Sequence, residues 1–143
     1  AVSTDTVFRM PMLAMLDAHV TGGGSAWSYH FTHPSSGFGG ALGAAHAVEI
    51  PFVFDNLGQP GTEMMLGDVT PERQRFAADV ADRWATFATA DDLTDGTPGW
   101  TVPGTDQAWP AYEPDRRAQV QLDVDAAVIE AHQDDLRELW LGA

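Results

Sequence analysis

The chain is organised around residues 43–54, which read GAAHAVEIPFVF and place a single histidine, His46, between small residues and an apolar run. The glycine and alanines before His46 let another backbone come close, and Ala47 keeps the next position small. Glu49 lies inside this apolar segment, where a charge is costly unless it is paired. The pattern fits a reactive imidazole on a tight loop before a short buried helix. It equally fits a core histidine at an ordinary helix start.

Upstream of this stretch, residues 26–32 carry the clearest strand pattern in the chain. Their side chains alternate between two faces, as they do along a pleated strand. One face holds Trp27, Tyr29 and Phe31, and the other holds Ser28, His30 and Thr32. Pro34 ends the strand, and a glycine-rich loop at residues 37–45 leads to His46. We therefore expect a strand followed by a loop that presents the histidine.

Two longer helices are predicted on either side of this unit. Residues 4–19 are apolar in nearly every direction, which predicts a mostly buried helix. Thr70 and Pro71 begin the second helix with a capping hydroxyl and a proline in the first turn. This helix extends to about residue 88, and its apolar face consists of Phe76, Val80, Trp84 and Phe87.

The segments between these helices and after them are less regular. Residues 48–54 predict a short helix or turn, and the glycine- and proline-rich residues 56–68 predict a surface loop. Residues 91–115 are irregular. Trp100 and Trp109 are expected to pin this irregular segment to the body of the protein, because large aromatic side chains dominate buried contacts.

The strands expected near the C-terminus are too few to form a complete sheet with the first one. A short strand is predicted at residues 118–123, while residues 126–131 fit no single pattern. A terminal helix is expected at residues 133–141, with an apolar side made of Leu136, Leu139 and Trp140. Since three or more strands are normally needed for stability, the chain has the pattern of one piece of a larger sheet protein.

The composition is that of a folded and strongly acidic chain. It contains 21 acidic residues, 7 arginines and no lysine, so its formal net charge is −14. This balance argues against nucleic acid and anionic membrane surfaces as partners, because no basic cluster can neutralise phosphates. No apolar stretch approaches the roughly 20 residues that span a bilayer, and no signal-peptide pattern opens the sequence. The absence of cysteine excludes disulfides and thiolate chemistry, and the cellular compartment stays open.

Five elements occur in a recognisable order along the chain. They are an apolar helix at 5–17, the aromatic strand at 27–31, the histidine stretch at 43–54, a W-x-x-F-A sequence at 84–88 and WPAY at 109–112. Together they resemble the C-terminal part of type B carboxylesterases, the cholinesterase-like branch of the α/β-hydrolases. The resemblance implies an α/β fold class: the C-terminal portion of an α/β-hydrolase fold, with few strands, flanking helices and an incomplete sheet.

The resemblance also implies a function for His46. In such serine esterases the serine lies in a G-x-S-x-G turn, an acid follows it, and the histidine comes last. No G-x-S-x-G occurs in this chain. Residues 1–143 are therefore expected to form a single C-terminal subdomain that supplies the triad histidine, is inactive alone, and completes an ester-cleaving site with the N-terminal part of the same protein. Two positions depart from the family pattern: Ala47 and Asp55 stand where glycine is usual or common.

The acidic residues near His46 are interpreted as structural. Glu49 could share a helical face with His46, but the family order places the triad acid before the histidine, so this role is rejected. We expect Glu49 to be a buried carboxylate paired with an arginine or with backbone N–H groups. Asp5 and Asp17 are the only acids before His46, and both are expected on the surface.

Two other functions compete with the esterase. A metal site could use His30, His33, His46 and Glu49, all acceptable zinc ligands, but strand alternation separates the first two. We expect neither a metal nor a cofactor. A non-catalytic interaction module is the other alternative, because an exposed sheet edge and an apolar first helix would drive self-association into a homo-oligomer.

Overall fold

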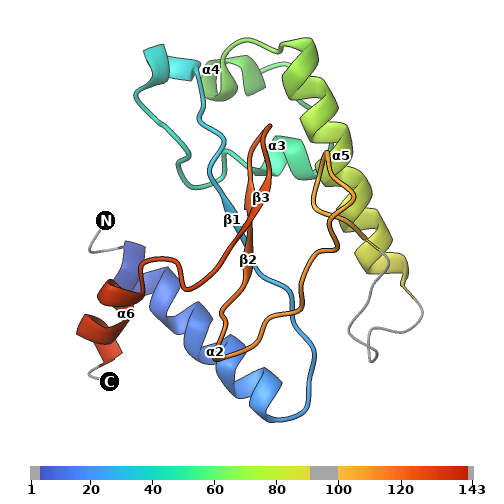
Figure 1. Cartoon of the computed structure of the whole chain (residues 1–143). Helices are drawn as coiled ribbons and strands as arrows, with labels where there is room; N and C mark the ends of the chain where they lie inside the picture. The colour runs from blue at the N-terminus through green and yellow to red at the C-terminus, as the bar shows by residue number, and fades with distance from the viewer. Residues whose placement is uncertain (1–3, 91–99, 142–143) are drawn as a thin grey trace.

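The fold consists of a small sheet flanked by helices (Figure 1). The computed structural model of the chain describes residues 4–90 and 100–141. Within these ranges the sheet has three strands in the order β1-β2-β3. The fold class is the predicted one, an α/β arrangement with an incomplete sheet.

The sheet joins the two predicted strands and adds a third. Strand β1 (Tyr29–Phe31) runs parallel to β2 (Gln119–Leu122), with Tyr29 beside Val120. Strand β3 (Ala127–Ile129) pairs antiparallel with β2, which assigns the segment that the sequence pattern left open. The other edge of β1 pairs with no strand of the described chain.

The alternation predicted along β1 is confirmed. The rings of Tyr29 and Phe31 both reach helix α5 (Pro71–Thr89), with centroids 4.9 Å from Trp84 and 6.1 Å from Phe76, respectively. His30 lies next to His132 instead, with ring centroids 5.0 Å apart. The aromatic face of the strand therefore packs against α5, and the polar face meets the C-terminal segment.

The first helix is present but is not mostly buried, so that expectation was wrong. It consists of a π-helical turn, η1 (Asp5–Arg9), and helix α2 (Met10–Thr21). Its apolar contribution to the core comes from Met10 and Leu13, which pack with Tyr112. Phe8 is 65% exposed. The helix is apolar on all sides, but the described chain covers only one of them.

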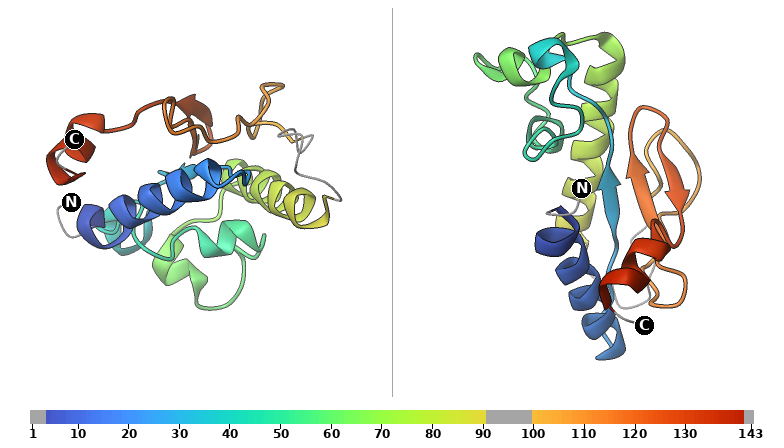
Figure 2. Two further views of the ribbon diagram at one scale, coloured as in Figure 1. Left: turned by 90° about the horizontal axis from the view of Figure 1, so that it is seen from below. Right: turned by 90° about the vertical axis from the view of Figure 1, so that its left-hand side faces the viewer.

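Helix α5 confirms the predicted start and apolar face. The hydroxyl of Thr70 accepts a hydrogen bond from the backbone N–H of Arg73 at 3.2 Å, as an N-cap does. Phe76 and Val80 are buried against the short helix α3 (Ile50–Val53), which was also predicted. Figure 2 shows α2 and α5 in the middle of the molecule, with β2 and β3 on one side and α3 and α4 on the other.

A further short helix, α4 (Thr62–Leu66), lies in the segment that was predicted to be a surface loop. Leu66 at its end is fully buried. The helix is too short to show a hydrophobic period, and the glycines on both sides of it resemble loop punctuation. Tertiary contact therefore decides its structure: a Cβ on Gly67 would lie 2.1 Å from the Ser36 hydroxyl, so only glycine permits this approach.

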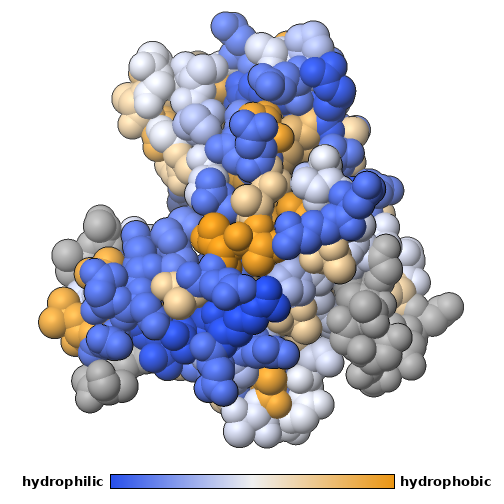
Figure 3. All heavy atoms as spheres, viewed as in Figure 1, coloured by the Kyte–Doolittle hydropathy of each residue, from blue (hydrophilic) through white to orange (hydrophobic). Residues whose placement is uncertain are grey.

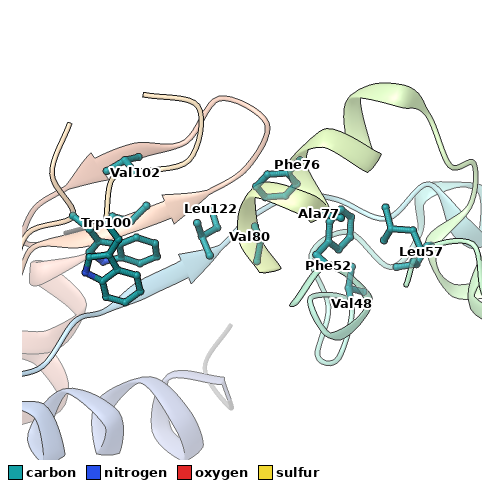
Figure 4. Close-up of a cluster of buried hydrophobic side chains, with 12 residues drawn as sticks. Val48, Phe52, Leu57, Phe76, Ala77, Val80, Trp100, Val102 and Leu122 are labelled. Carbon is teal, nitrogen blue, oxygen red and sulfur yellow. The ribbon is translucent and has the colours of Figure 1, made fainter. Parts of the chain in front are cut away.

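One continuous core joins α3, α5, the sheet and the irregular segment that begins at Trp100 (Figure 4). Trp100 and Trp109 stack at 4.9 Å and are both buried, which confirms that they pin this segment. Residues 91–99 of the predicted irregular region lie outside the described residues. The core members are Val48, Phe52, Leu57, Leu66, Phe76, Ala77, Val80, Trp100, Val102, Trp109, Val120 and Leu122.

The terminal helix α6 (Asp134–Leu141) forms as predicted, but its apolar side is not buried. Leu139 is 74% exposed, although α6 contacts α2. Figure 3 shows an apolar area in the middle of one face, where the strands lie, between two hydrophilic surfaces. Among the described ranges, no helix combines the length and apolar character needed to cross a membrane.

Candidate active site

His46 lies on a tight turn between the end of β1 and helix α3. A bridge between Ser35 and Gly43 closes the base of the preceding loop, with the N–H of Ser35 donating to the carbonyl of Gly43 at 3.0 Å. The N–H of Val48 then donates to the carbonyl of Ala45 at 3.2 Å, which folds the chain around His46. The sequence therefore presents the histidine on a loop before a short helix, as expected.

The backbone shows why the family pattern has glycine at the two positions where this chain has Ala47 and Asp55. Ala47 has φ = 72° and Asp55 has φ = 46°, so each lies in the left-handed region that favours glycine. For an alanine this conformation costs about 1–2 kcal/mol, because Cβ approaches the following carbonyl oxygen. The residue directly after His46 is therefore held in a strained conformation by its surroundings.

The imidazole of His46 is exposed. Its nearest ring is that of Phe8, stacked at 6.4 Å between centroids with 17° between the planes. Within residues 4–90 and 100–141, neither ring nitrogen of His46 has a hydrogen-bond or ion-pair partner. Both nitrogens can therefore form hydrogen bonds with groups that lie outside this chain.

An apolar cavity of about 330 Å³ borders His46. It lies between the loop before His46 and the α4 region, and it opens to the surface. A neutral, apolar group held there would lie next to the imidazole. The lining residues are Phe38, Leu42, Ala45, His46, Val48, Gly61, Met64 and Met65.

Glu49 does not have the environment predicted for it. The side chain is half-buried rather than buried, and no arginine or backbone N–H of the described chain pairs with it. Its charge acts on Tyr29: burial raises the pKa of the Tyr29 phenol, and the Glu49 carboxylate raises it further. Glu49 lies just before α3, and no cationic side chain among the described residues pairs with it.

The two upstream acids are also not free surface groups, which corrects that expectation. Asp5 is buried and accepts a hydrogen bond from Arg9 Nε at 2.7 Å. Asp17 accepts one from the hydroxyl of Tyr112 at 2.8 Å. The Asp5 bond lies within the first helix, whereas Asp17 joins this helix to Tyr112, and neither acid is bonded to His46.

The four residues considered as zinc ligands do not converge. His30 is paired with His132, and burial lowers the pKa of His30, with further lowering by His132 and Arg9. The nitrogens of His33 are both occupied by protein groups. Among the described residues, no group of three or more His, Asp or Glu side chains is arranged to hold a metal ion.

The environment of His33 was missed by the sequence analysis. His33 Nδ1 lies 2.6 Å from Asp123 Oδ1, and Arg73 Nε donates to His33 Nε2 at 3.1 Å. We name these three residues the His33 cluster. No local signal predicts it, because its members come from the end of β1, the start of α5 and the end of β2.

Structural comparison places the chain among esterases of the α/β-hydrolase fold. It superposes on a PNB esterase with a TM-score of 0.75 at 28% identity, covering 94% of this chain and 25% of that one. A carboxylesterase of Geobacillus stearothermophilus gives a TM-score of 0.75 at 32% identity, over 97% and 26% of the two chains. An esterase from Clostridium hathewayi, described as able to hydrolyse aliphatic aromatic polyesters, gives 0.72 at 26% identity, over 97% and 25%.

The sequence comparisons agree with this class of protein. The sequence model of the carboxylesterase family matches residues 1–139, so the chain belongs to the carboxylesterase family. Para-nitrobenzyl esterase of Bacillus subtilis (strain 168) is 29% identical over 138 residues, which are 94% of this chain and 25% of that protein. The chain thus spans about a quarter of the length of the relatives that it matches.

Proposed function

We propose that the chain is the C-terminal subdomain, residues 1–143, of a serine esterase that cleaves carboxylic esters through an acyl-serine, and that His46 is its general base. Family membership supports the reaction class. The observation that carries the role of His46 is its place on a strained, exposed turn beside an apolar cavity. The serine and the triad acid then belong to the N-terminal part of the same polypeptide, outside this chain.

In this reaction the exposed imidazole performs two proton transfers. One nitrogen of His46 accepts the proton of the serine hydroxyl as the serine oxygen attacks the ester carbonyl, and the same proton then goes to the leaving alcohol. A water molecule then attacks the acyl-serine. The imidazole accepts the proton of this water and returns it to the serine oxygen as the acid is released. The triad acid holds the other ring nitrogen, which fixes the tautomer. The apolar cavity beside His46 suits a neutral substrate group.

The role of His46 is tested by replacing it in the complete open reading frame that contains this chain. His46→Ala should lower turnover of an aryl ester roughly a hundred- to ten-thousand-fold, the usual contribution of a general base. His19→Ala is the matched control, because His19 is also exposed but lies on α2, with its Nε2 3.1 Å from the carbonyl oxygen of Ser25. Unchanged turnover in His46→Ala would exclude the proposed role.

For the 143-residue chain alone, we propose that it does not cleave esters, because one triad member cannot form an acyl-enzyme. A fluorophosphonate that labels active serines should leave the isolated chain unlabelled while labelling the complete polypeptide. Covalent labelling of the isolated chain at any serine would contradict this.

A second behaviour of the isolated chain is self-association. It is favoured by the free edge of β1 and by exposed apolar side chains on the first helix, such as Val7, Phe8 and Met15. In the complete protein these surfaces are expected to meet the N-terminal part. Light scattering on the chain across a concentration series should show oligomers, and a monomer at every concentration would exclude self-association.

A further inference from the structure

The His33 cluster is a buried group of hydrogen-bonded polar side chains that the proposed reaction does not use. His33 is 8% exposed and Arg73 is 7% exposed. The imidazole is surrounded by the rings of Phe52 and Phe76, each with its centroid 5.3 Å away, and by Phe31 at 6.4 Å. Both nitrogens nevertheless have polar partners, so no hydrogen-bonding capacity of the ring is lost on burial.

The partners determine the protonation state of His33. A guanidinium has only donors, so the Arg73 Nε–H must be received by a lone pair on His33 Nε2. The ring proton is then on Nδ1, where it is donated to Asp123 at 2.6 Å. Asp123 Oδ1 also accepts from the backbone N–H of Val124 at 2.8 Å, which fixes the carboxylate. His33 is therefore neutral, in the Nδ1–H tautomer.

Arg73 makes further contacts through Nη1 and the face of its guanidinium. Its Nη1 donates to the carbonyl of Leu66 at 2.8 Å and to that of Asp68 at 2.7 Å, and its guanidinium carbon lies 5.4 Å from the centre of the Phe52 ring. Burial lowers the pKa of Arg73, and the Asp68 charge opposes this effect. Arginine remains charged at all ordinary pH values, so the donor to His33 is permanent.

The charged groups around His33 can be named element by element. Asp123 faces it from the end of β2 and Arg73 from α5, with Asp68 near the guanidinium from the loop after α4. The contacts from α3 and from the rest of α5 are the aromatic rings of Phe52 and Phe76. A second proton on His33, at Nε2, would thus be directed at the Arg73 N–H, with no acceptor within the described part of the chain.

The cluster contacts one end of the segment that carries His46 and is joined to the other end through the chain at Ser35. At the far end, Phe52 of α3 is fully buried between His33, Phe76 and the Arg73 guanidinium. At the near end, Ser35 follows His33 closely in the chain and binds the carbonyl of Gly43 through its N–H. The Ser35 hydroxyl also donates to the carbonyl of Met65, beside the α4 carbonyl that Arg73 holds.

We propose that His33 is a positioning residue for His46, and that a proton added at Nε2 breaks its contact with Arg73 and releases residues 43–52 from their supports. The catalytic part of this inference rests on the proposed function of His46, whereas the link between His33 and the segment does not. Acid then disorders the turn that carries His46 through the contact between His33 and Arg73.

The experiment measures the link by NMR, without catalysis. In the 143-residue chain carrying His46→Asn, which removes the His46 imidazole, two-bond ¹H–¹⁵N spectra should show His33 as the Nδ1–H tautomer at neutral pH. The backbone amides of residues 45–48 should then shift as the pH falls, together with the His33 ring signals. The Nε2–H tautomer at neutral pH, or amides of 45–48 that do not follow His33, would overturn the inference.

Two variants separate positioning from a merely structural role. His33→Gln can place an amide oxygen in front of Arg73 but cannot be protonated, so the acid-dependent shift of residues 45–48 should disappear. Asp123→Asn keeps an acceptor for Nδ1–H but removes the negative charge, so the shift should move to lower pH. His19→Gln is the control and should leave it unchanged. A shift that persists in His33→Gln would contradict the proposal even if both variants fold.

These outcomes are independent of ester hydrolysis. If the amides follow His33 but His46→Ala in the complete polypeptide keeps full turnover, the proposed function fails and the structural link stands. If His46→Ala abolishes turnover but the amides ignore His33, the function stands and the positioning role fails.

Discussion

Two histidines on the same connection, His33 and His46, differ in nearly every physical respect. His33 is buried, and both of its nitrogens are bonded to Asp123 and Arg73. His46 is exposed, has no polar partner in the described residues, and precedes an alanine with φ = 72°. The His33 imidazole stabilises the fold because both of its nitrogens are hydrogen-bonded within the chain. The His46 imidazole is available for chemistry because its nitrogens are not.

The largest loss of stability is expected when the arginine that bonds to the buried His33 is replaced. Arg73→Met leaves the Leu66 and Asp68 carbonyls and His33 Nε2 without their donor, so the free energy of unfolding should fall by about 3–5 kcal/mol. Urea denaturation of the chain measures it.

Arg75 offers the matched control for this change, because it is an exposed arginine on the same helix. Arg75→Met should alter the free energy of unfolding by less than about 0.5 kcal/mol. Equal losses in the two variants would show that the His33 cluster contributes nothing special to stability.

A smaller change in stability is expected at Ala47, the strained residue after His46. Ala47→Gly relieves the left-handed backbone, so the free energy of unfolding should rise by about 0.5–1 kcal/mol after the greater freedom of glycine in the unfolded chain is subtracted. Thermal or urea denaturation measures the gain. Ala44→Gly, in the same loop without a positive φ, should bring no gain.

Asp55→Gly provides an internal scale for the same effect. Asp55 also has a positive φ, but a short polar side chain tolerates this region better than alanine does. Its gain should therefore be the smaller of the two. A larger gain at Asp55 than at Ala47 would mean that the turn after His46 is not strained.

The smallest change in stability is expected at His30, which is half-buried, whereas His33 is buried and His46 is exposed. Burial and its cationic neighbours lower its pKa in the folded chain below the ordinary 6.5, so the unfolded chain binds the proton first. Stability is therefore complete above pH 6.5 and is lost as the pH falls through this value towards the folded-state pKa. His30→Gln should lose less stability than the unaltered chain between neutral pH and about pH 5. Urea midpoints at several pH values measure this, and identical losses would contradict it.

Local signals made much of the fold predictable. The Thr70 cap, the alternation of Tyr29 and Phe31, and the anchoring of Trp100 and Trp109 follow from neighbouring residues or simple spacing. Helix α4 could not be predicted, because contacts made by Leu66 and Gly67 with distant residues determine it.

The site was predictable only in part for the same reason. His46 carries a sequence motif, and the strain at Ala47 appears where the family has glycine. The His33 cluster joins residues separated by 40 and 90 positions, so no pattern along the chain reveals it. Glu49 was predicted to be paired, but no partner for it lies among the described residues.

We propose that His46, and not the buried His33, transfers protons during ester cleavage. A direct measurement is chemical rescue of His46→Ala in the complete polypeptide with added imidazole, since removal of the side chain leaves a space that a free imidazole can fill. We predict that aryl-ester turnover, lost in His46→Ala, rises with imidazole concentration, and that His33→Ala gains nothing from imidazole. Full turnover of His46→Ala without imidazole, or equal rescue of both variants, would contradict the account.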